Sequence, residues 1–359
     1  MVNTNDDWTD GLYDGEPYVS GEQPKSSKLI KLNSNENPYP PAPQVAEAIR
    51  SFDSSTLRYY SNSNGSPLKE ALAEYHGVNP NQVFVGNGSD EVLALSFRAC
   101  FGTGKPILFP DITYSFYPVW CSFLGIPYKT IPIKDDFSIN ADDYSENNGG
   151  VVIANPNAPT SIGEGYDFIK NILDSNSKSI VIVDEAYADF AEFSAESLLN
   201  DYPNLLVVRT FSKSKSLAGL RIGYALGSEK VVSALIAAKD SFNSYPIDSV
   251  AITAGVAALA AKDYYKGITD KIIAAREYAA KAFTEMGFNV IPSATNFLFV
   301  GFDTKGNAKA MFDFLRSNDI LVRYFDKPGI NQYLRISVGT MDEMQQLVKV
   351  ASECSTIRK

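Results

Sequence analysis

The sequence is poor in several residues and segments that particular classes of protein require. Its 359 residues include a single histidine, His76, which excludes catalytic triads with a histidine base and multi-histidine metal sites, so we expect no bound metal. The three cysteines have no paired spacing, which favours a reducing compartment and predicts a cytoplasmic protein. No run approaches the ~18 consecutive apolar residues of a membrane span, and the acidic N-terminal stretch lacks the apolar segment of a signal peptide.

Positive charge is also scarce. The chain has 32 Lys and Arg residues against 42 Asp and Glu, and a net charge of -10 argues against binding of nucleic acid or an anionic membrane.

The length exceeds the ~100–200 residues typical of one domain and predicts two domains. His76 is expected to lie near the end of the helix in SPLKEALAEYHG, so acid–base chemistry falls to Lys, Tyr, Asp, Glu or Cys.

Short apolar runs alternate with amphipathic segments between about residues 80 and 230. The runs predicted to be strands are QVFVG, PILFP, PYKTIPI, GGVVIAN, SIVIVDEAY and NLLVVRTF. Continuous Val, Ile and Leu suits strands buried on both faces, which predicts an α/β fold with a mostly parallel sheet flanked by helices. Near residue 265 the pattern changes to that of a smaller α+β domain. We therefore expect an N-terminal arm (1–40), a large domain (41–264) and a small C-terminal domain (265–359).

Polar groups follow several of the predicted strands. One strand leads into Asn155–Thr160, a second into Asp184–Tyr187, a third into Ser212 and Lys213, and a fourth into Asn87–Glu91 at the start of a helix. Taken singly, each group fits an ordinary turn or helix cap. Because ligands of open α/β sheets bind beyond the carboxyl ends of the strands, we expect these groups to meet at one edge of the sheet.

Two shorter motifs in this region suggest functions that their surroundings do not support. Gly86-x-Gly88 begins like a dinucleotide-binding fingerprint, but Glu91 occupies the position of the third glycine. Ser212-x-x-Lys215 matches the serine–lysine pattern of β-lactamase-like enzymes, but the companion S-D-N and K-T-G elements are absent from the sequence.

An amine, a carboxylate, a phenol, an amide and a helix N-terminus at one edge match the needs of pyridoxal 5'-phosphate. That cofactor takes a lysine as covalent partner, a carboxylate at its ring nitrogen, and backbone N–H groups with a cation at its phosphate. Longer motifs are LNSNENPYP, RYYSNSNGSPLKEALAEYHGV, NGSDEVL, PDITYSFY, NPNAPTS, VIVDEAYADF, RTFSKSKSLAGLRIGY and LRISVGT. Through them nearly the whole chain resembles the fold-type-I aminotransferases, and within these the histidinol-phosphate aminotransferases.

The resemblance implies roles for the groups at the strand ends. Lys213, directly after the serine that follows the strand, corresponds to the lysine that bonds the cofactor and moves the proton in transamination. Lys215 stands where the family usually has an aromatic or small residue, and we expect it to be a solvated loop lysine. Asp184 should pair with the ring nitrogen, while Asn157 and Tyr187 should hydrogen-bond the phenolic oxygen.

The resemblance also implies which residues contact the ring and the phosphate of the cofactor and how subunits assemble. Tyr114 should stack on the cofactor ring, and Tyr59 resembles the residue that reaches the phosphate from a partner subunit, which implies a homodimer contacted by the N-terminal arm. The phosphate itself should be held by Ser89, Asp90, Thr210, Ser212 and Arg221.

The substrate residues lie outside the strand-end motifs. Arg335 in YLRISVG resembles the arginine that binds the anionic end of the substrate. Arg323 in ILVRYF is either part of a surface ion pair or a second anion ligand, and two arginines suit a phosphate dianion. Tyr18 and Asn37 resemble positions that close over the substrate. These residues imply L-histidinol phosphate as amino donor and 2-oxoglutarate as acceptor, in histidine biosynthesis.

Three departures from the family pattern leave room for other substrates and activities. Ala158 and Ser161 replace the usual Asn and Gly, and Tyr60 stands where proline is common. An aromatic-amino-acid aminotransferase has the same chemistry, and a threonine-phosphate decarboxylase is a lyase on the same frame that needs no oxo-acid acceptor. A non-enzymatic cofactor-binding module is disfavoured, because every group that should contact the cofactor is present.

Overall fold

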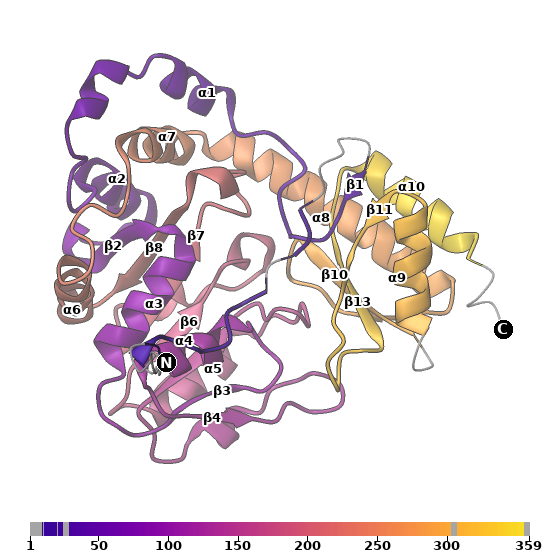
Figure 1. Cartoon of the computed structure of the whole chain (residues 1–359), viewed down its shortest axis with the longest axis horizontal. Helices are drawn as coiled ribbons and strands as arrows, with labels where there is room; N and C mark the ends of the chain where they lie inside the picture. Colours follow the sequence, from indigo (N-terminus) through magenta and orange to yellow (C-terminus); the bar gives the residue numbers. More distant parts are fainter. Residues whose placement is uncertain (1–8, 10, 20, 24–28, 303–306, 355–359) are drawn as a thin grey trace, which may run out of the picture.

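The computed structural model describes residues 9, 11–19, 21–23, 29–302 and 307–354. The remaining positions of the predicted N-terminal arm and of the predicted C-terminal domain lie outside the described residues. In Figure 1 a larger part, coloured indigo to pink, lies beside a smaller part, coloured orange to yellow.

A seven-stranded sheet forms the centre of the larger part. In chain order its strands are β2 (Val83–Asn87), β3 (Ile107–Pro110), β4 (Tyr128–Ile131), β5 (Gly150–Ala154), β6 (Val181–Asp184), β7 (Leu205–Thr210) and β8 (Ile222–Gly227). Across the sheet they follow the order β2-β8-β7-β6-β5-β3-β4. Strand β8 is antiparallel to β2 and β7, and the other neighbouring pairs are parallel. The predicted α/β fold with a mostly parallel sheet is confirmed.

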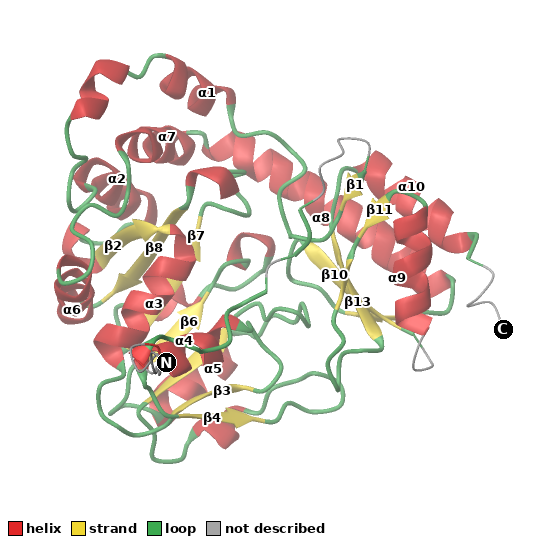
Figure 2. Ribbon diagram, viewed as in Figure 1, coloured by secondary structure: helices red, strands yellow, loops and turns green. Residues whose placement is uncertain are grey.

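The central strands are apolar on both faces because helices cover both faces (Figure 2). Along β6, Val181 and Val183 belong to one hydrophobic core and Ile182 to the other, as the two-residue repeat of a strand requires. The helices on the first face are α1 (Pro43–Arg50), α2 (Ser66–His76), α5 (Tyr166–Ser175) and α7 (Ser249–Ala260). Those on the second are α3 (Gly88–Cys100), α4 (Phe116–Leu124) and α6 (Glu229–Asp240).

Strand β8 is the one element of this sheet that the sequence does not reveal, because two glycines dilute its apolar pattern. One of them is required by close packing against the start of α3. A Cβ atom on Gly223 would lie 2.3 Å from the carbonyl carbon of Gly88 and from the nitrogen of Ser89. Only glycine therefore lets the strand pass the first turn of that helix.

The smaller part is a second sheet backed by helices. Its antiparallel strands are β9 (Asn289–Ile291), β10 (Phe297–Gly301), β12 (Arg323–Tyr324) and β13 (Tyr333–Ser337), in the order β12-β13-β10-β9, and its helices include α9 (Asn307–Ser317) and α10 (Met341–Ser352). A capping box of Thr340 and Glu343 starts α10. The N-terminal segment joins this part through β1 (Ile30–Lys31), which pairs in parallel with β11 (Ile320–Leu321).

Helix α8 (Lys262–Glu285) connects the two parts and belongs to both cores. Tyr265 and Ile268, near its start, pack with the first face of the large sheet, whereas Ile272 and Phe283 pack with the small sheet. The predicted boundary at 264/265 thus falls inside a continuous helix, and the division into domains stays a prediction. Within the described ranges, no helix has both the length and the apolar character needed to cross a membrane.

Candidate active site

The carboxyl ends of β5, β6 and β7 and the N-terminus of α3 face a cavity of about 550 Å³. The N-terminal segment and the small sheet supply its other walls. The predicted site residues that line it are Tyr18, Ser89, Asp90, Tyr114, Asp184, Tyr187, Thr210, Ser212, Lys213, Arg221, Arg323 and Arg335. The strand-end groups and both substrate arginines therefore lie around a single space.

Asp184, at the end of β6, has a buried carboxylate of which only one oxygen is satisfied. Its Oδ2 accepts a hydrogen bond from the Tyr117 hydroxyl of α4 at 2.8 Å. Its Oδ1 is buried and has no hydrogen-bond partner among the described residues. Burial is the main cause that raises the pKa of Asp184 to about 6. A cationic nitrogen at Oδ1 would satisfy that oxygen and favour the ionised carboxylate.

The turn after β7 brings Lys213 into the cavity. Its Nζ lies 3.4 Å from the backbone oxygen of Ser34 and 5.7 Å from the centre of the Tyr187 ring. The Tyr187 hydroxyl accepts a hydrogen bond from Nδ2 of Asn35 at 2.9 Å. An amine and a phenol therefore share one side of the cavity, which suits a cofactor with an aldehyde next to a phenolic oxygen.

The first turn of α3 forms an anion cradle together with Arg221. Nη2 of Arg221 lies 3.1 Å from Oδ2 of Asp90, and its Nη1 lies 3.5 Å from Oγ of Ser212. The Thr210 hydroxyl donates to the same Ser212 oxygen at 3.0 Å. The first N–H groups of a helix have no intrahelical acceptor, and with a guanidinium beside them they suit a phosphate.

Two arginines lie directly opposite each other on the small sheet. The strand register pairs Arg323 with Arg335, and their guanidinium carbons lie 5.2 and 5.4 Å from the centre of the Phe325 ring. Nη2 of Arg335 donates to the backbone oxygen of Asn33 at 2.9 Å, while its buried Nε has no partner in the described part of the chain. Burial lowers the pKa of Arg335, and the charge of Arg323 adds to this shift. Like charges opposite each other are unfavourable, so this pair favours a bound anion.

Aromatic rings form a further wall of the cavity. Tyr18 stacks on Phe116 with ring centres 4.2 Å apart, and Phe116 stacks on Trp120 at 4.9 Å. Tyr114 lies 6.4 Å from Tyr18, and its hydroxyl donates to Oδ1 of Asp90 at 2.9 Å. Flat faces of this kind suit planar rings in both cofactor and substrate.

Asn157 lies beside the cavity but is not one of the residues that line it. Its Nδ2 donates to the backbone oxygen of Ile112 at 3.0 Å and to the Thr160 hydroxyl at 2.9 Å, which uses both amide hydrogens. The predicted contact of Asn157 with a phenolic oxygen would require one of these bonds to be exchanged, and it stays a prediction.

Asn37 and Tyr59 also lie outside the cavity lining. Nδ2 of Asn37 donates to the backbone oxygen of Lys213 at 3.0 Å and is 3.4 Å from that of Ser214. The amide hydrogens of Asn37 thus face the carbonyl groups of the lysine turn, and its predicted closure over the substrate stays a prediction. Tyr59 is 63 % exposed on the larger part, as a residue directed at a partner subunit would be.

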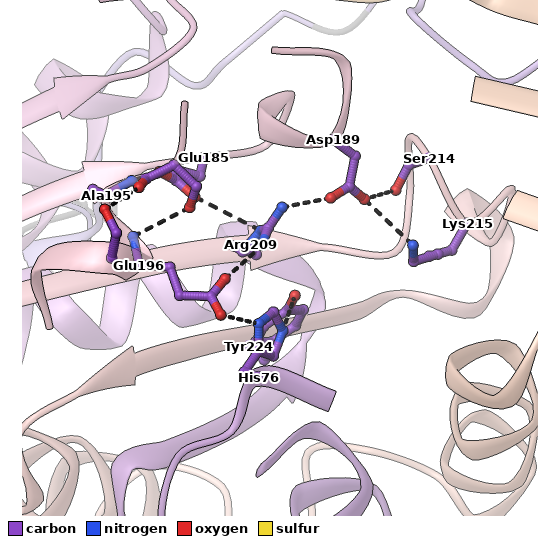
Figure 3. Close-up of polar contacts among 11 residues, drawn as sticks. His76, Glu185, Asp189, Ala195, Glu196, Arg209, Ser214, Lys215 and Tyr224 are labelled. Carbon is purple, nitrogen blue, oxygen red and sulfur yellow. Dashed lines mark hydrogen bonds and ion pairs between the residues drawn. The ribbon is translucent and has the colours of Figure 1, made fainter. Parts of the chain in front are cut away.

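The prediction that Lys215 is a solvated loop lysine is wrong. Only 12 % of its side chain is exposed, and Nζ lies 3.5 Å from Oδ2 of Asp189 (Figure 3). The same Nζ lies 5.5 and 5.2 Å from the ring centres of Tyr75 and Tyr265. An ion pair and two aromatic faces offset the loss of water around the ammonium group.

Two residues of the site were not singled out from the sequence. Asn35 sits in a left-handed conformation with φ 54° and holds Tyr187, and Tyr117 donates to Asp184. A signal exists for Tyr117, because it lies in the aromatic helix YSFYPVW, where a buried hydroxyl needs a partner. The repeated asparagines of LNSNENPYP are the corresponding signal for Asn35.

The arrangement of sheet, lysine turn and small sheet is that of the fold-type-I aminotransferases. A crystal structure of histidinol-phosphate aminotransferase from Sinorhizobium meliloti in complex with pyridoxal-5'-phosphate matches with a TM-score of 0.81 and 29% identity, covering 90% of this chain and 91% of that one. The profile of the family "Aminotransferase class I and II" matches residues 27–350, and the chain belongs to this family.

Similar curated proteins extend over almost the full length. Histidinol-phosphate aminotransferase 1 from Methylococcus capsulatus is 50% identical, covering 96% of this chain and 97% of that protein. Histidinol-phosphate aminotransferase from Chromohalobacter salexigens is 48% identical, covering 95% and 97% respectively.

We predict opposite effects of Asp184→Asn on stability and on catalysis. Folding raises the pKa of Asp184 from 3.8 to about 6, so its contribution to stability is present below pH ~4 and is lost as the pH rises through ~6. The variant, without cofactor, should therefore unfold at a higher temperature than the wild type at pH 7 but not at pH 4. Cofactor content should stay near normal, and transamination should fall by on the order of a hundredfold or more.

Thermal unfolding of the cofactor-free proteins at the two pH values, together with single-turnover kinetics, tests this prediction. Unchanged activity in Asp184→Asn would mean that the carboxylate has only a structural role.

Proposed function

We propose that this protein is a pyridoxal-phosphate-dependent aminotransferase that transfers the amino group of L-histidinol phosphate to 2-oxoglutarate in histidine biosynthesis. This rests on the groups that meet in one cavity: a lysine amine, a helix N-terminus with an arginine, two facing arginines, and a buried carboxylate oxygen that has no partner in the described ranges. Relatives with 48% and 50% identity that bear the name histidinol-phosphate aminotransferase support the choice of substrate.

The residues present fit this cofactor. Lys213 would bond it, the free Oδ1 of Asp184 would face its ring nitrogen, and Tyr187 would donate to its phenolic oxygen. The α3 N-terminus, Ser212 and Arg221 would hold its phosphate. When bound, the cofactor supplies an electron sink that stabilises negative charge at the substrate Cα.

The chain's own groups have distinct tasks in this proposal. Lys213 Nζ takes the proton from the Cα of the amino donor and, in the second half-reaction, delivers a proton to the Cα of the acceptor. Its place above the Tyr187 ring keeps the amine at that side of the cavity. The ionised Asp184 keeps the nitrogen that it faces protonated. Tyr18 and Phe116 offer an aromatic wall against which a flat imidazole can lie. The roles of Lys213 and Asp184 follow those implied by the sequence motifs, and the wall formed with Phe116 comes from the structure.

Cysteine chemistry is not part of the proposal. Burial raises the pKa of the Cys100 and Cys121 thiols to about 12, so neither supplies a thiolate near neutral pH. We also propose a cytoplasmic location, which is supported by the cysteine usage of the sequence.

The arginine pair supports a phosphate at the substrate's anionic end. Histidinol phosphate presents a phosphate where an ordinary amino acid presents its α-carboxylate, and a dianion can engage two guanidinium groups. The buried Nε of Arg335, which has no partner within the described residues, and the adjacent charge of Arg323 leave donors for such a group.

A homodimer with composite sites is the proposed assembly. Tyr59 is 63 % exposed and lies outside the cavity, so a role at the phosphate would have to be fulfilled in a neighbouring subunit. Exposed aromatic side chains accompany it: Tyr60 stacks on Tyr245 at 4.6 Å, and Phe242 is 79 % exposed. A surface of this kind favours a protein partner.

We predict that Arg323→Ala lowers kcat/KM for histidinol phosphate more than for the other substrates. Loss of one guanidinium should reduce kcat/KM for histidinol phosphate by about tenfold to a hundredfold, the range for one charge-assisted hydrogen bond, and affect 2-oxoglutarate and tyrosine much less. Arg335→Ala should impair every substrate. Arg316→Ala, which removes an arginine of α9 that is paired with Glu22, serves as the control and should change none of them.

The measurement is kcat/KM for each half-reaction in the three variants. An equal loss for all substrates in Arg323→Ala would contradict a phosphate-specific role and favour an aromatic-amino-acid aminotransferase. Release of carbon dioxide from threonine phosphate without an oxo acid would instead identify the decarboxylase.

Mixed dimers test the composite site. Lys213→Ala and Tyr59→Ala should each be nearly inactive alone. After unfolding and refolding together they should regain about a quarter of wild-type activity, since random pairing makes half of the dimers mixed and one of two sites in each is intact. Each variant refolded alone is the control. No recovery in a mixture shown to contain mixed dimers, or a fully active monomer in sedimentation, would refute the shared site.

A further inference from the structure

Asp189 lies outside the cavity lining, yet it contacts the turn that contains Lys213 (Figure 3). It belongs to the short 3-10 helix Ala188–Phe190, which follows β6. Its Oδ2 accepts a hydrogen bond from the Ser214 hydroxyl and forms the ion pair with Lys215. Its Oδ1 pairs with Nη2 of Arg209 at 2.5 Å. One carboxylate thus joins the strand β7, through Arg209, to the two residues after Lys213.

The lysine turn is held from two directions. On one side, Asn37 donates to the backbone oxygens of Lys213 and Ser214. On the other, Asp189 binds the Ser214 side chain, and Ser214 as a whole is only 2% exposed. Because the peptide bond between Lys213 and Ser214 is planar, holding Ser214 restricts the directions in which the Lys213 side chain can leave the backbone.

Electrostatics makes Asp189 a permanent acceptor. Burial alone would raise its pKa, but the charges of Arg209 and Lys215 and the Ser214 hydrogen bond outweigh that effect and hold the pKa well below its usual range. Glu185, another carboxylate near Arg209, behaves differently, since burial raises its pKa to about 7. Asp189 therefore stays fully ionised near neutral pH, where Glu185 is in part protonated.

We propose that Asp189 is a positioning residue for Lys213, acting through the Ser214 hydroxyl to direct the lysine amine toward the bound cofactor. This inference rests on the proposed function. Without the Asp189–Ser214 bond, the turn loses the side-chain contact next to Lys213, although the Asn37 contacts and the backbone hydrogen bond from Leu217 to Phe211 remain. The Lys213 amine can then point in a wider range of directions. Bond formation with the cofactor should then be slower, although the phosphate cradle is untouched.

A rival explanation is that Asp189 merely neutralises Arg209, and Glu196 provides the matched control. Both carboxylates pair with Arg209, Glu196 at 3.2 Å, and their side chains are similarly exposed, 30% for Asp189 and 26% for Glu196. The second partner of Glu196 is Nδ1 of His76, whose Nε2 is hydrogen-bonded to the Tyr224 hydroxyl. Neither of these residues belongs to the lysine turn. Glu196→Gln therefore perturbs the same guanidinium without touching Ser214.

The experiment measures how fast added pyridoxal phosphate bonds to Lys213 in cofactor-free protein, by absorbance and by borohydride trapping of the modified lysine. Ser214→Ala and Asp189→Asn should each slow bond formation about tenfold, and the double variant should be no slower than either single variant. Glu196→Gln should stay within about twofold of the wild type. Thermal unfolding of each variant shows whether the rate follows global stability.

Two results would overturn the inference: wild-type rates in Ser214→Ala, or equal slowing in Asp189→Asn and Glu196→Gln. Ser214→Ala removes no charge, so its rate of bond formation tests the positioning role even if Asp189→Asn does not fold. A wild-type protein that bonds no cofactor at Lys213 would refute the proposed function itself, and Lys213→Ala supplies the blank for that measurement.

Discussion

The polar structure behind the cavity depends on one buried cation, Arg209, which projects from β7 with 10% of its side chain exposed. A guanidinium in this position without partners would destabilise the fold by about 3–5 kcal/mol. It is satisfied by Asp189 and Glu196, which lie on the two short helices after β6, and by Glu185 at 3.8 Å. Because Asp189 and Glu196 must reach Arg209, the segment after β6 lies against the sheet edge, next to the turn that contains Lys213.

The cavity differs from the region around Arg209, because several of its polar groups lack a hydrogen-bond partner among the described residues. Oδ1 of Asp184 and Nε of Arg335 are buried without partners among the described residues, and Arg323 faces Arg335 across the strand pair. Each arrangement opposes folding in isolation. An anionic substrate and a cationic ring nitrogen would remove all three conflicts. Among the described residues, the charges behind the site are thus paired, whereas several polar groups within it lack partners, which would tie stability to bound ligands.

Local apolar runs were sufficient for six of the seven strands of the sheet and for the groups at its carboxyl edge. The choice of Lys213 over Lys215 came from the resemblance to the family and stays a prediction. The sequence did not reveal β8, whose glycine is set by a contact with α3. The solvated state expected for Lys215 was wrong for a similar reason, since Asp189 and two tyrosines from distant segments surround it. Nor could local pattern show that the amide of Asn157 is already occupied. Long-range contacts decided each case.

The stretch from Asn33 to Asn37 links the two halves of the site. Asn33 accepts a hydrogen bond from Arg335, and Asn37 holds the backbone of Lys213. Between them Asn35 binds Tyr187. Since successive Cα atoms are about 3.8 Å apart, this short backbone, which turns at the left-handed Asn35, limits the separation between Arg335 and the turn that contains Lys213. In the proposed function, the distance from the anionic end of the substrate to its reacting carbon would therefore be set by the stretch from Asn33 to Asn37 as well as by the two parts of the molecule that it contacts.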